Sequence, residues 1–250
     1  MKITGVDWLK TKYSFLLADT SKKGLFRSVA ENLYEFRSKK KFKAIGVSHP
    51  DYCSNLDKTN SMSANKDAHE NQPSSFYSLK KAFGLLDLDS SNISLLDIGC
   101  GAGRVLSFGM LLNFKEVYGV DLDDPALQKA MDNCKEMKKK GYKTSFYIGH
   151  EDACNYNIPK SVNVIYLFNP FGEKTMKQVF ANIVKHANLS GNELYIVYSN
   201  PACNDVFTKY ESCTKIFESY YKSKKPDIFI FKISPSVFSQ GTSSDQALAL

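Results

Sequence analysis

Three glycines stand close together behind a short apolar segment of the chain. They are separated by single residues, at Gly99, Gly101 and Gly103, and Arg104 follows them. Because glycine lacks a side chain, a turn made from it lets main-chain N–H groups come close to a ligand at the start of a helix. Residues 95–103 therefore predict a buried strand that leads into a ligand-binding turn and then into a helix.

The spacing of the glycines distinguishes between two kinds of cofactor. A dinucleotide-binding turn has the pattern Gly-x-Gly-x-x-Gly, and its third glycine would stand where this chain has Arg104. Asp97, in the predicted strand, also suits a site for the charged amino-acid group of a cofactor better than a site for a pyrophosphate. The pattern makes a nicotinamide-dependent oxidoreductase the less favoured alternative.

The segment Asp-Ile-Gly-Cys-Gly-Ala-Gly at residues 97–103 resembles motif I of the class I S-adenosylmethionine (SAM)-dependent methyltransferases. The resemblance extends over residues 76–233, since further landmarks of that family follow in its order. It implies a Rossmann-like α/β fold, SAM as the cofactor and methyl transfer as the reaction. By the same resemblance the cofactor would lie against Asp97, Gly99, Cys100, Gly101 and Gly103.

Two further segments match positions that hold the nucleoside of the cofactor in that family. Asp121 ends the second predicted strand, where a carboxylate suits the two ribose hydroxyls, and Leu122 would lie against the adenine. Asp152 and Ala153, after the third strand, match the segment that holds the adenine edge. A lone aspartate is often a helix cap or a surface charge, but three in the order of the family favour a binding site.

The fourth predicted strand ends in Asn169, Pro170 and Phe171, at the edge where open α/β sheets bind ligands. This run resembles the Asn-Pro-Pro-Tyr type of motif IV in methyltransferases that modify nitrogen, and departs from it at the third and fourth positions. The Asn169 side-chain oxygen could accept a hydrogen bond from an amine, and Phe171 could pack against the acceptor or the methyl-bearing cation, so nitrogen is the expected acceptor atom. A simple Asn-Pro turn between strand and helix is an equally weighted alternative.

A weaker resemblance links residues 72–77 and 166–171 to bacterial relatives of the non-SET histone-lysine methyltransferase group. In those enzymes the segment before motif I folds over the cofactor, and by analogy Tyr77 and residues 70–75 would gate the site. The matching stretches are short and do not identify a protein-lysine substrate. His150 is a candidate base, although a histidine at a strand end is more often a surface or capping residue.

Apolar periodicity supplies the elements that would position these residues. Strands are expected at residues 94–98, 116–120, 144–148, 162–168, 193–198, 215–221 and 227–233, the last two as an antiparallel pair. Helices are expected over residues 25–42, after a cap at Ser74 or Ser75, from an N-cap at Asp124, and near Glu173. The predicted fold is therefore a Rossmann-like, doubly wound α/β fold with a mostly parallel seven-strand sheet and an antiparallel last strand.

The expected organisation is one catalytic domain with additions at both ends. Residues 1–75 are predicted to form a basic, helical N-terminal segment or lid, residues 76–235 the methyltransferase domain, and residues 236–250 a flexible tail. Neither a membrane-spanning stretch nor a signal peptide is recognisable, so a cytoplasmic location is expected. The six cysteines lack metal-binding spacing, and we expect free thiols and no metal site.

The net charge of +7 lies entirely in the first 50 residues, which hold eleven Lys or Arg against four Asp or Glu. Residues 37–43 are the densest part and could attract an acidic partner, but no aromatic interleaving marks a base-stacking surface, so a solvated helix face is favoured. The predicted substrate is a small molecule or a protein side chain, with nucleic acid less favoured. A non-catalytic module that binds SAM or nucleic acid is the second alternative.

Overall fold

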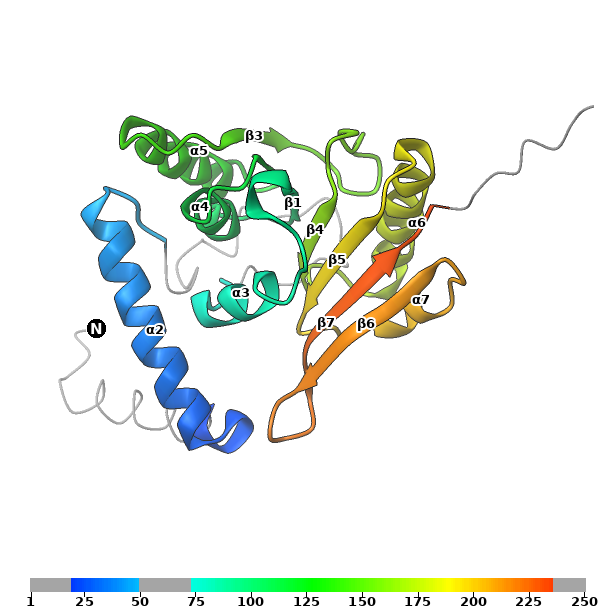
Figure 1. Ribbon diagram of the computed structural model, residues 1–250, viewed down its shortest axis with the longest axis horizontal. Coiled ribbons are helices and arrows are strands. Elements are labelled where there is room, and N and C mark those ends of the chain that lie inside the picture. Colours follow the sequence, from blue (N-terminus) through cyan, green and yellow to red (C-terminus); the bar gives the residue numbers. More distant parts are fainter. Residues whose placement is uncertain (1–18, 50–72, 236–250) are drawn as a thin grey trace, which may run out of the picture.

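The computed structural model describes residues 19–49 and 73–235, which form a seven-stranded sheet with helices on both faces (Figure 1). The strands are β1 (Ser94–Ile98), β2 (Glu116–Asp121), β3 (Ser145–His150), β4 (Val164–Phe168), β5 (Leu194–Ser199), β6 (Cys213–Tyr220) and β7 (Pro226–Ile233). Their order is β3-β2-β1-β4-β5-β7-β6, and β7 runs antiparallel to both of its neighbours. The other pairings are parallel, so the predicted Rossmann-like, doubly wound fold is confirmed.

Two apolar clusters join the helices to the two faces of the sheet. The first face packs against α2 (Leu25–Ala44), α3 (Phe76–Phe83), α4 (Arg104–Leu111) and α5 (Asp124–Lys139). The second face packs against α6 (Glu173–Ser190) and α7 (Asn204–Thr208), and a 3-10 turn, η1 (Ser90–Asn92), precedes β1. Because both faces are covered, every residue of β1 is buried, as are the first four residues of β4.

The helix starts follow the capping signals closely. Ser75 caps α3, and its hydroxyl accepts the N–H of Ser78 at 3.2 Å. Helix α5 begins one residue earlier than predicted, because Asp123 rather than Asp124 is the cap and accepts the N–H of Ala126 at 3.0 Å. Helix α7 was not expected, since five residues are too few to show a helical period.

The apolar rhythm that identifies helix α2 lies on its solvent side rather than on its buried side. The exposed apolar residues are Leu25, Phe26, Val29, Leu33 and Phe36. Phe26 is 93% exposed, whereas the polar residues Glu31 and Ser38 are buried. The periodicity thus predicts the helix correctly but indicates the wrong face. No helix within residues 19–49 and 73–235 has the length and apolar character needed to cross a membrane.

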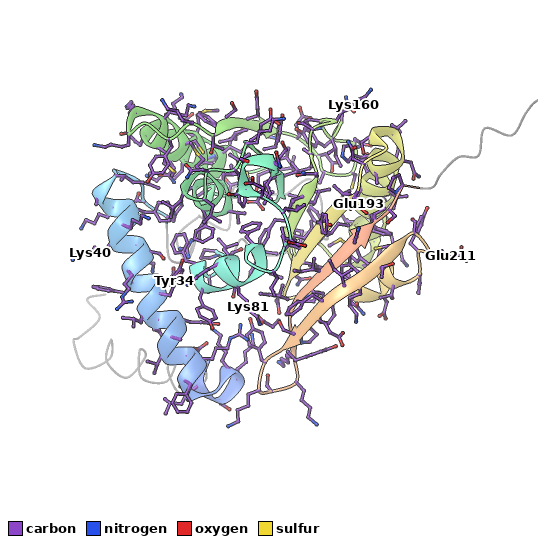
Figure 2. All side chains as sticks on the ribbon, viewed as in Figure 1. Tyr34, Lys40, Lys81, Lys160, Glu193 and Glu211 are labelled. Carbon is purple, nitrogen blue, oxygen red and sulfur yellow. The ribbon has the colours of Figure 1, made fainter. Side chains whose placement is uncertain are left out.

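A buried ion-pair cluster explains why the polar side of α2 turns inward. The carboxylate of Asp227, on β7, is 1% exposed and lies 2.9 Å from two guanidinium nitrogens of Arg27 on α2. Lys81 Nζ, on α3 and labelled in Figure 2, lies 3.1 Å from the same carboxylate. Although burial opposes ionisation, Arg27 and Lys81 hold the pKa of Asp227 below its usual value of 3.8. Buried charges need such partners, so α2 docks by its polar side.

Asp227→Ala is expected to lower the free energy of unfolding by about 3 kcal/mol, because Arg27 and Lys81 lose their shared carboxylate. Urea unfolding followed by circular dichroism measures the loss. The folded-state pKa of Asp227 is depressed, so its stabilisation is present above the unfolded value of 3.8 and is lost as the pH falls through the folded value. The difference between wild type and variant should therefore narrow in acid.

Glu193→Ala is the matched control, since it removes a carboxylate whose side chain is 54% exposed and which pairs with Lys232 at 2.5 Å. Its stability should equal that of the wild type within error. Equal losses of unfolding free energy in Asp227→Ala and Glu193→Ala would show that the buried Asp227 cluster stabilises the fold no more than an exposed ion pair does.

Candidate functional site

The carboxyl ends of β1, β2 and β4 meet at one edge of the sheet. Strand β1 lies between the other two, and Ile98 is paired with Val120 on one side and with Leu167 on the other. The winding of the chain reverses between β1 and β4, which is where open α/β sheets bind ligands. The glycine turn, the end of β2 and the turn that begins at Asn169 therefore lie side by side.

The backbone of the glycine turn adopts conformations that favour glycine. Gly99, Gly101 and Gly103 have φ angles of 79°, 49° and 73°. The N–H groups of Gly99 and Cys100 donate to the Val120 carbonyl at 2.9 and 3.1 Å. A Cβ on Gly103 would lie 2.8 Å from the Cβ of Ala130 on α5, so a side chain there would push the turn away from that helix.

Asp121 fastens the glycine turn to the end of β2. Its Oδ2 accepts the N–H of Gly101 at 2.7 Å. Its Oδ1 accepts the N–H groups of Leu122 and Asp123 at 2.7 and 3.1 Å. A carboxylate offers about four acceptor positions, so about one remains after these three bonds. The carboxylate can hold the turn in place and still accept a hydroxyl from a ligand.

Asp97 carries a buried carboxylate oxygen that lacks a protein partner. The residue is 3% exposed, and among the described residues its Oδ2 has no hydrogen-bond partner. Burial, and then the negative charge of Asp121, raise the pKa of Asp97 well above its usual value of 3.8. A carboxyl group in this state gains most from a cation or an N–H donor. The position therefore fits the ammonium of an amino-acid ligand.

Asn169 follows β4 in a left-handed conformation, with a φ of 41°, which asparagine tolerates better than most residues. The Tyr198 hydroxyl, on β5, accepts the N–H of Cys203 at 3.2 Å and donates its own hydrogen to Asn169 Oδ1 at 3.2 Å. Burial raises the pKa of Tyr198, so the phenol keeps this hydrogen. The amide is thereby fixed in one orientation, and Oδ1 retains a second lone pair.

Pro170 brings the Asn169 turn against the glycine turn. A Cβ on Gly99 would lie 3.3 Å from the Cβ of Pro170, so the two backbones approach closely at this point. Phe171 is partly buried and packs against the core cluster on the α6 side of the sheet. The structure therefore joins two sequence-predicted segments that are about 70 residues apart.

The remaining predicted residues lie around the ends of β2 and β3. The N–H of Glu151 donates to the Asp121 carbonyl at 3.2 Å, which brings the loop after β3 beside the end of β2. In this loop Asp152 is exposed, whereas Ala153 is buried. His150 Nδ1 lies 2.5 Å from Asp124 Oδ1 at the surface, which favours a surface pair over a catalytic base.

Arg104 links the end of the glycine turn to α2. It stands at the position where a dinucleotide-binding turn has its third glycine. Its Nη1 lies 2.6 Å from Glu35 Oε1 and 3.1 Å from the Ser74 carbonyl. Its guanidinium carbon lies 4.6 Å from the ring centroid of Phe76, whose N–H donates to the other oxygen of Glu35. Sequence reasoning missed this tie because Glu35 stands 69 residues earlier, without any motif around it.

Two further contacts hold the glycine turn and the helix that follows it, from the side of α5 and of the chain after α2. Asn133 donates to the Ala102 carbonyl at 3.2 Å. His49 Nε2 lies 3.1 Å from Ser107 Oγ on α4, the helix that begins directly after the turn. Burial, and then the positive charge of Arg104, lower the pKa of His49 to about 3, so the ring is neutral near pH 7. Nothing in the sequence pattern marks either residue.

Tyr77 lies on α3 and faces α2. Its ring centroid is 6.3 Å from that of Tyr34, and the Arg27 guanidinium carbon is 5.9 Å from it. Most of the predicted lid, residues 1–18 and 50–72, lies outside the described residues, as does the predicted tail after residue 235. The gating role of Tyr77 and of residues 70–75 stays a prediction.

Comparison with known proteins finds a methyltransferase domain at this edge of the sheet. Residues 95–191 match a family model described as a methyltransferase domain, and no curated protein matches the chain. Similar solved structures include an RNA methyltransferase from Salinibacter ruber in complex with S-adenosyl-L-homocysteine (SAH), at 13% identity over 67% of this chain and 97% of that chain, with a TM-score of 0.47. An O-methyltransferase from Bacillus cereus in complex with SAH has 13% identity, coverage of 65% and 82%, and a TM-score of 0.48.

The region matched by the family model contains the glycine turn, the end of β2, the Asn169 turn and helix α6. These are the elements that meet at the functional edge of the doubly wound sheet. The methyltransferase resemblance predicted from motif I is confirmed, because residues 95–191 match a methyltransferase domain, and SAM is the methyl donor that this resemblance implies.

Proposed function

We propose that the protein transfers the methyl group of SAM to a nitrogen atom of a small molecule or of a protein side chain, at the edge between the glycine turn and Asn169. The observation that carries the proposal is the close approach of Pro170 to Gly99, because the Cβ of Pro170 lies 3.3 Å from where a Cβ on Gly99 would stand. This approach places the turn that begins at Asn169 beside the glycine turn. SAM supplies a methyl group on a positively charged sulfur. The protein holds an acceptor close to it and in line.

The cofactor contacts in this proposal follow from the groups left available at the edge. The unpartnered oxygen of Asp97 receives the ammonium of the cofactor, and the remaining lone pair of Asp121 accepts a ribose hydroxyl. Leu122 borders the adenine, whose edge meets Asp152 and Ala153. The cofactor lies against the main chain of Gly99, Cys100, Gly101 and Gly103.

The acceptor contacts centre on the amide of Asn169. Its oxygen already takes one hydrogen bond from Tyr198 and has room for a second, from an acceptor N–H. That bond would aim the nitrogen lone pair away from Asn169 and toward the methyl group. Pro170 and Phe171 shape the wall beside it. An amine that is neutral needs orientation more than a strong base, which agrees with the surface pairing of His150.

In the same proposal residues 76–235 form the catalytic domain and residues 1–75 cover it, with residues 236–250 as a tail. The contacts from Glu35 to Arg104 and from His49 to Ser107 support a covering role for the described part of this segment. Both contacts end on α4, the helix that begins directly after the glycine turn, so this segment is attached next to the proposed cofactor site.

Asp97→Asn is expected to weaken SAH binding at least tenfold at pH 7.5, about 1.4 kcal/mol, because a neutral amide replaces the carboxylate that would meet the ammonium. The folded apo protein holds the Asp97 proton more tightly than the unfolded chain, so ionised Asp97 costs stability as the pH rises. The variant should therefore unfold in urea no more easily than the wild type. Isothermal titration calorimetry measures the affinity.

Asp132→Asn, at an exposed position on α5, is the control and should bind SAH like the wild type. An unchanged affinity in Asp97→Asn would remove Asp97 from the site. Binding of NADH in place of SAH would contradict the cofactor contacts as a whole.

Asn169→Gly keeps the left-handed backbone free of strain and removes only the amide. We expect turnover to fall about a hundredfold through loss of acceptor orientation, with a smaller effect on SAH affinity. Tyr198→Phe should lower turnover by a smaller factor, because it removes the bond that fixes the amide. SAH formation measures turnover, with primary amines and lysine- or glutamine-containing peptides as acceptors.

Tyr118→Phe removes a comparable hydroxyl, 3.2 Å from Ser161 Oγ, and should leave turnover unchanged. Mass spectrometry of the product locates the methyl group. A methyl group on oxygen or carbon, or wild-type turnover in Asn169→Gly, would overturn the nitrogen assignment while leaving SAH binding intact.

A further inference from the structure

Two lysine-rich segments that are distant in sequence meet at one corner of the molecule. The first is the end of α2, where Lys40 is labelled in Figure 2, and the second is the end of α5 with the loop that follows it. Two hydrogen bonds join the segments, from Ser48 N to Asn133 Oδ1 at 3.2 Å and from Asn133 Nδ2 to the Ser48 carbonyl at 3.0 Å. The fold therefore brings together, at this corner, the lysines at the ends of α2 and α5, which are far apart in the sequence.

The surface between these segments is hollowed. One hollow of about 430 Å³ is lined by Ile45, Asn113, Lys140, Gly141, Tyr142 and Lys143. A second, of about 180 Å³, shares Asn113 and Lys143 with the first and adds Lys115. We call the two together the lysine groove. Its three lysines are exposed, and none of the residues that line either hollow is an aspartate or a glutamate.

Nearby contacts fix the loop that borders the groove, and among the described residues none of its three lysines forms a salt bridge, although Lys115 interacts electrostatically with the adjacent Glu116. Lys138 Nζ donates to the carbonyls of Lys143 and Thr144 at 3.0 and 3.3 Å, which fixes the loop that follows α5. The carboxylate of Glu136, one turn inside the helix, pairs with Lys139 at 2.5 Å. Lys143 is therefore exposed on a fixed loop, and Lys140 and Lys115 are exposed beside it.

The groove lies at the opposite edge of the sheet from the cofactor. Lys115 immediately precedes β2, and Lys143 comes just before β3, so both stand at the amino ends of parallel strands. The cofactor turn stands at the carboxyl ends. Strands of five or six residues separate the two edges by roughly 20 Å. A ligand of the groove is therefore distinct from the cofactor.

We propose that the lysine groove binds the phosphate backbone of a single-stranded nucleic acid. Lysines spaced along a continuous hollow match a chain of repeated negative charges better than a single small anion. Tyr142 packs partly against the core, and its exposed part, beside Lys140 and Lys143, offers an aromatic surface for a base next to the contacted phosphates.

A membrane surface matches the groove less well. Peripheral membrane binding needs exposed apolar side chains beside the charges. Among the described residues, none of the large exposed apolar side chains lines either hollow. The exposed apolar residues of α2 stand toward its first half, whereas the chain after its end, at Ile45, borders the groove. Exposed lysines without a large exposed apolar side chain among them favour the nucleic acid.

The test is fluorescence anisotropy of a labelled 20-nucleotide oligo(U) with the full-length protein, without SAM, at increasing salt. Lys140→Glu/Lys143→Glu should weaken binding at least tenfold at low salt. The slope of log affinity against log salt should fall by about 1.4, the value for two lost phosphate contacts on a single strand. Lys115→Glu, on a different loop, should weaken binding as well.

Lys160→Glu/Lys185→Glu is the matched control, with the same charge change at two exposed positions outside the groove, and Lys160 is labelled near α6 in Figure 2. It should retain affinity within twofold. Equal losses in the control and the groove variants, or no binding of oligo(U) by the wild type, would overturn the proposal. So would binding to vesicles of anionic phospholipid that the groove variants abolish while oligo(U) binding persists.

Discussion

The bond on which the functional edge depends is the one from the Gly101 N–H to Asp121 Oδ2, at 2.7 Å. It joins a turn that has no side chains of its own to the end of a neighbouring strand. Without it the turn would rest on the bonds from Gly99 and Cys100 to Val120 and on packing at Gly103. One carboxylate therefore shapes the backbone and keeps about one acceptor position for a ligand.

The negative charge of Asp121 also makes ionisation of the neighbouring Asp97 less favourable. Asp97 is buried beside Asp121, and both burial and the charge of Asp121 oppose ionisation of Asp97, whose pKa is raised for that reason. In the proposed site a positively charged ligand relieves this state, at a cost to the stability of the unliganded fold. That proposal gives a reason for an unsatisfied polar atom in a core where most polar atoms are paired.

Local chemistry in the sequence predicts the parts of this protein that depend on neighbours along the chain. The glycine turn, the cap at Ser75 and the residue ranges of the strands around β1 follow from residue type and spacing. The orientation of α2 does not, because it is decided by the bond between Arg27 and Asp227, which are 200 residues apart. An apolar stripe predicts a buried face only when no stronger pairing turns the helix over.

The contacts around the site show the same division between near and distant partners. Asn169 was found from its motif, but the hydroxyl that orients it belongs to Tyr198, 29 residues later on the next strand. Tyr198 looks like any core aromatic in sequence, since alternation in a buried strand says nothing about a hydroxyl. A motif therefore identifies Asn169 as a candidate site residue, whereas the hydroxyl that holds it in place becomes visible only when the sheet brings the two strands together.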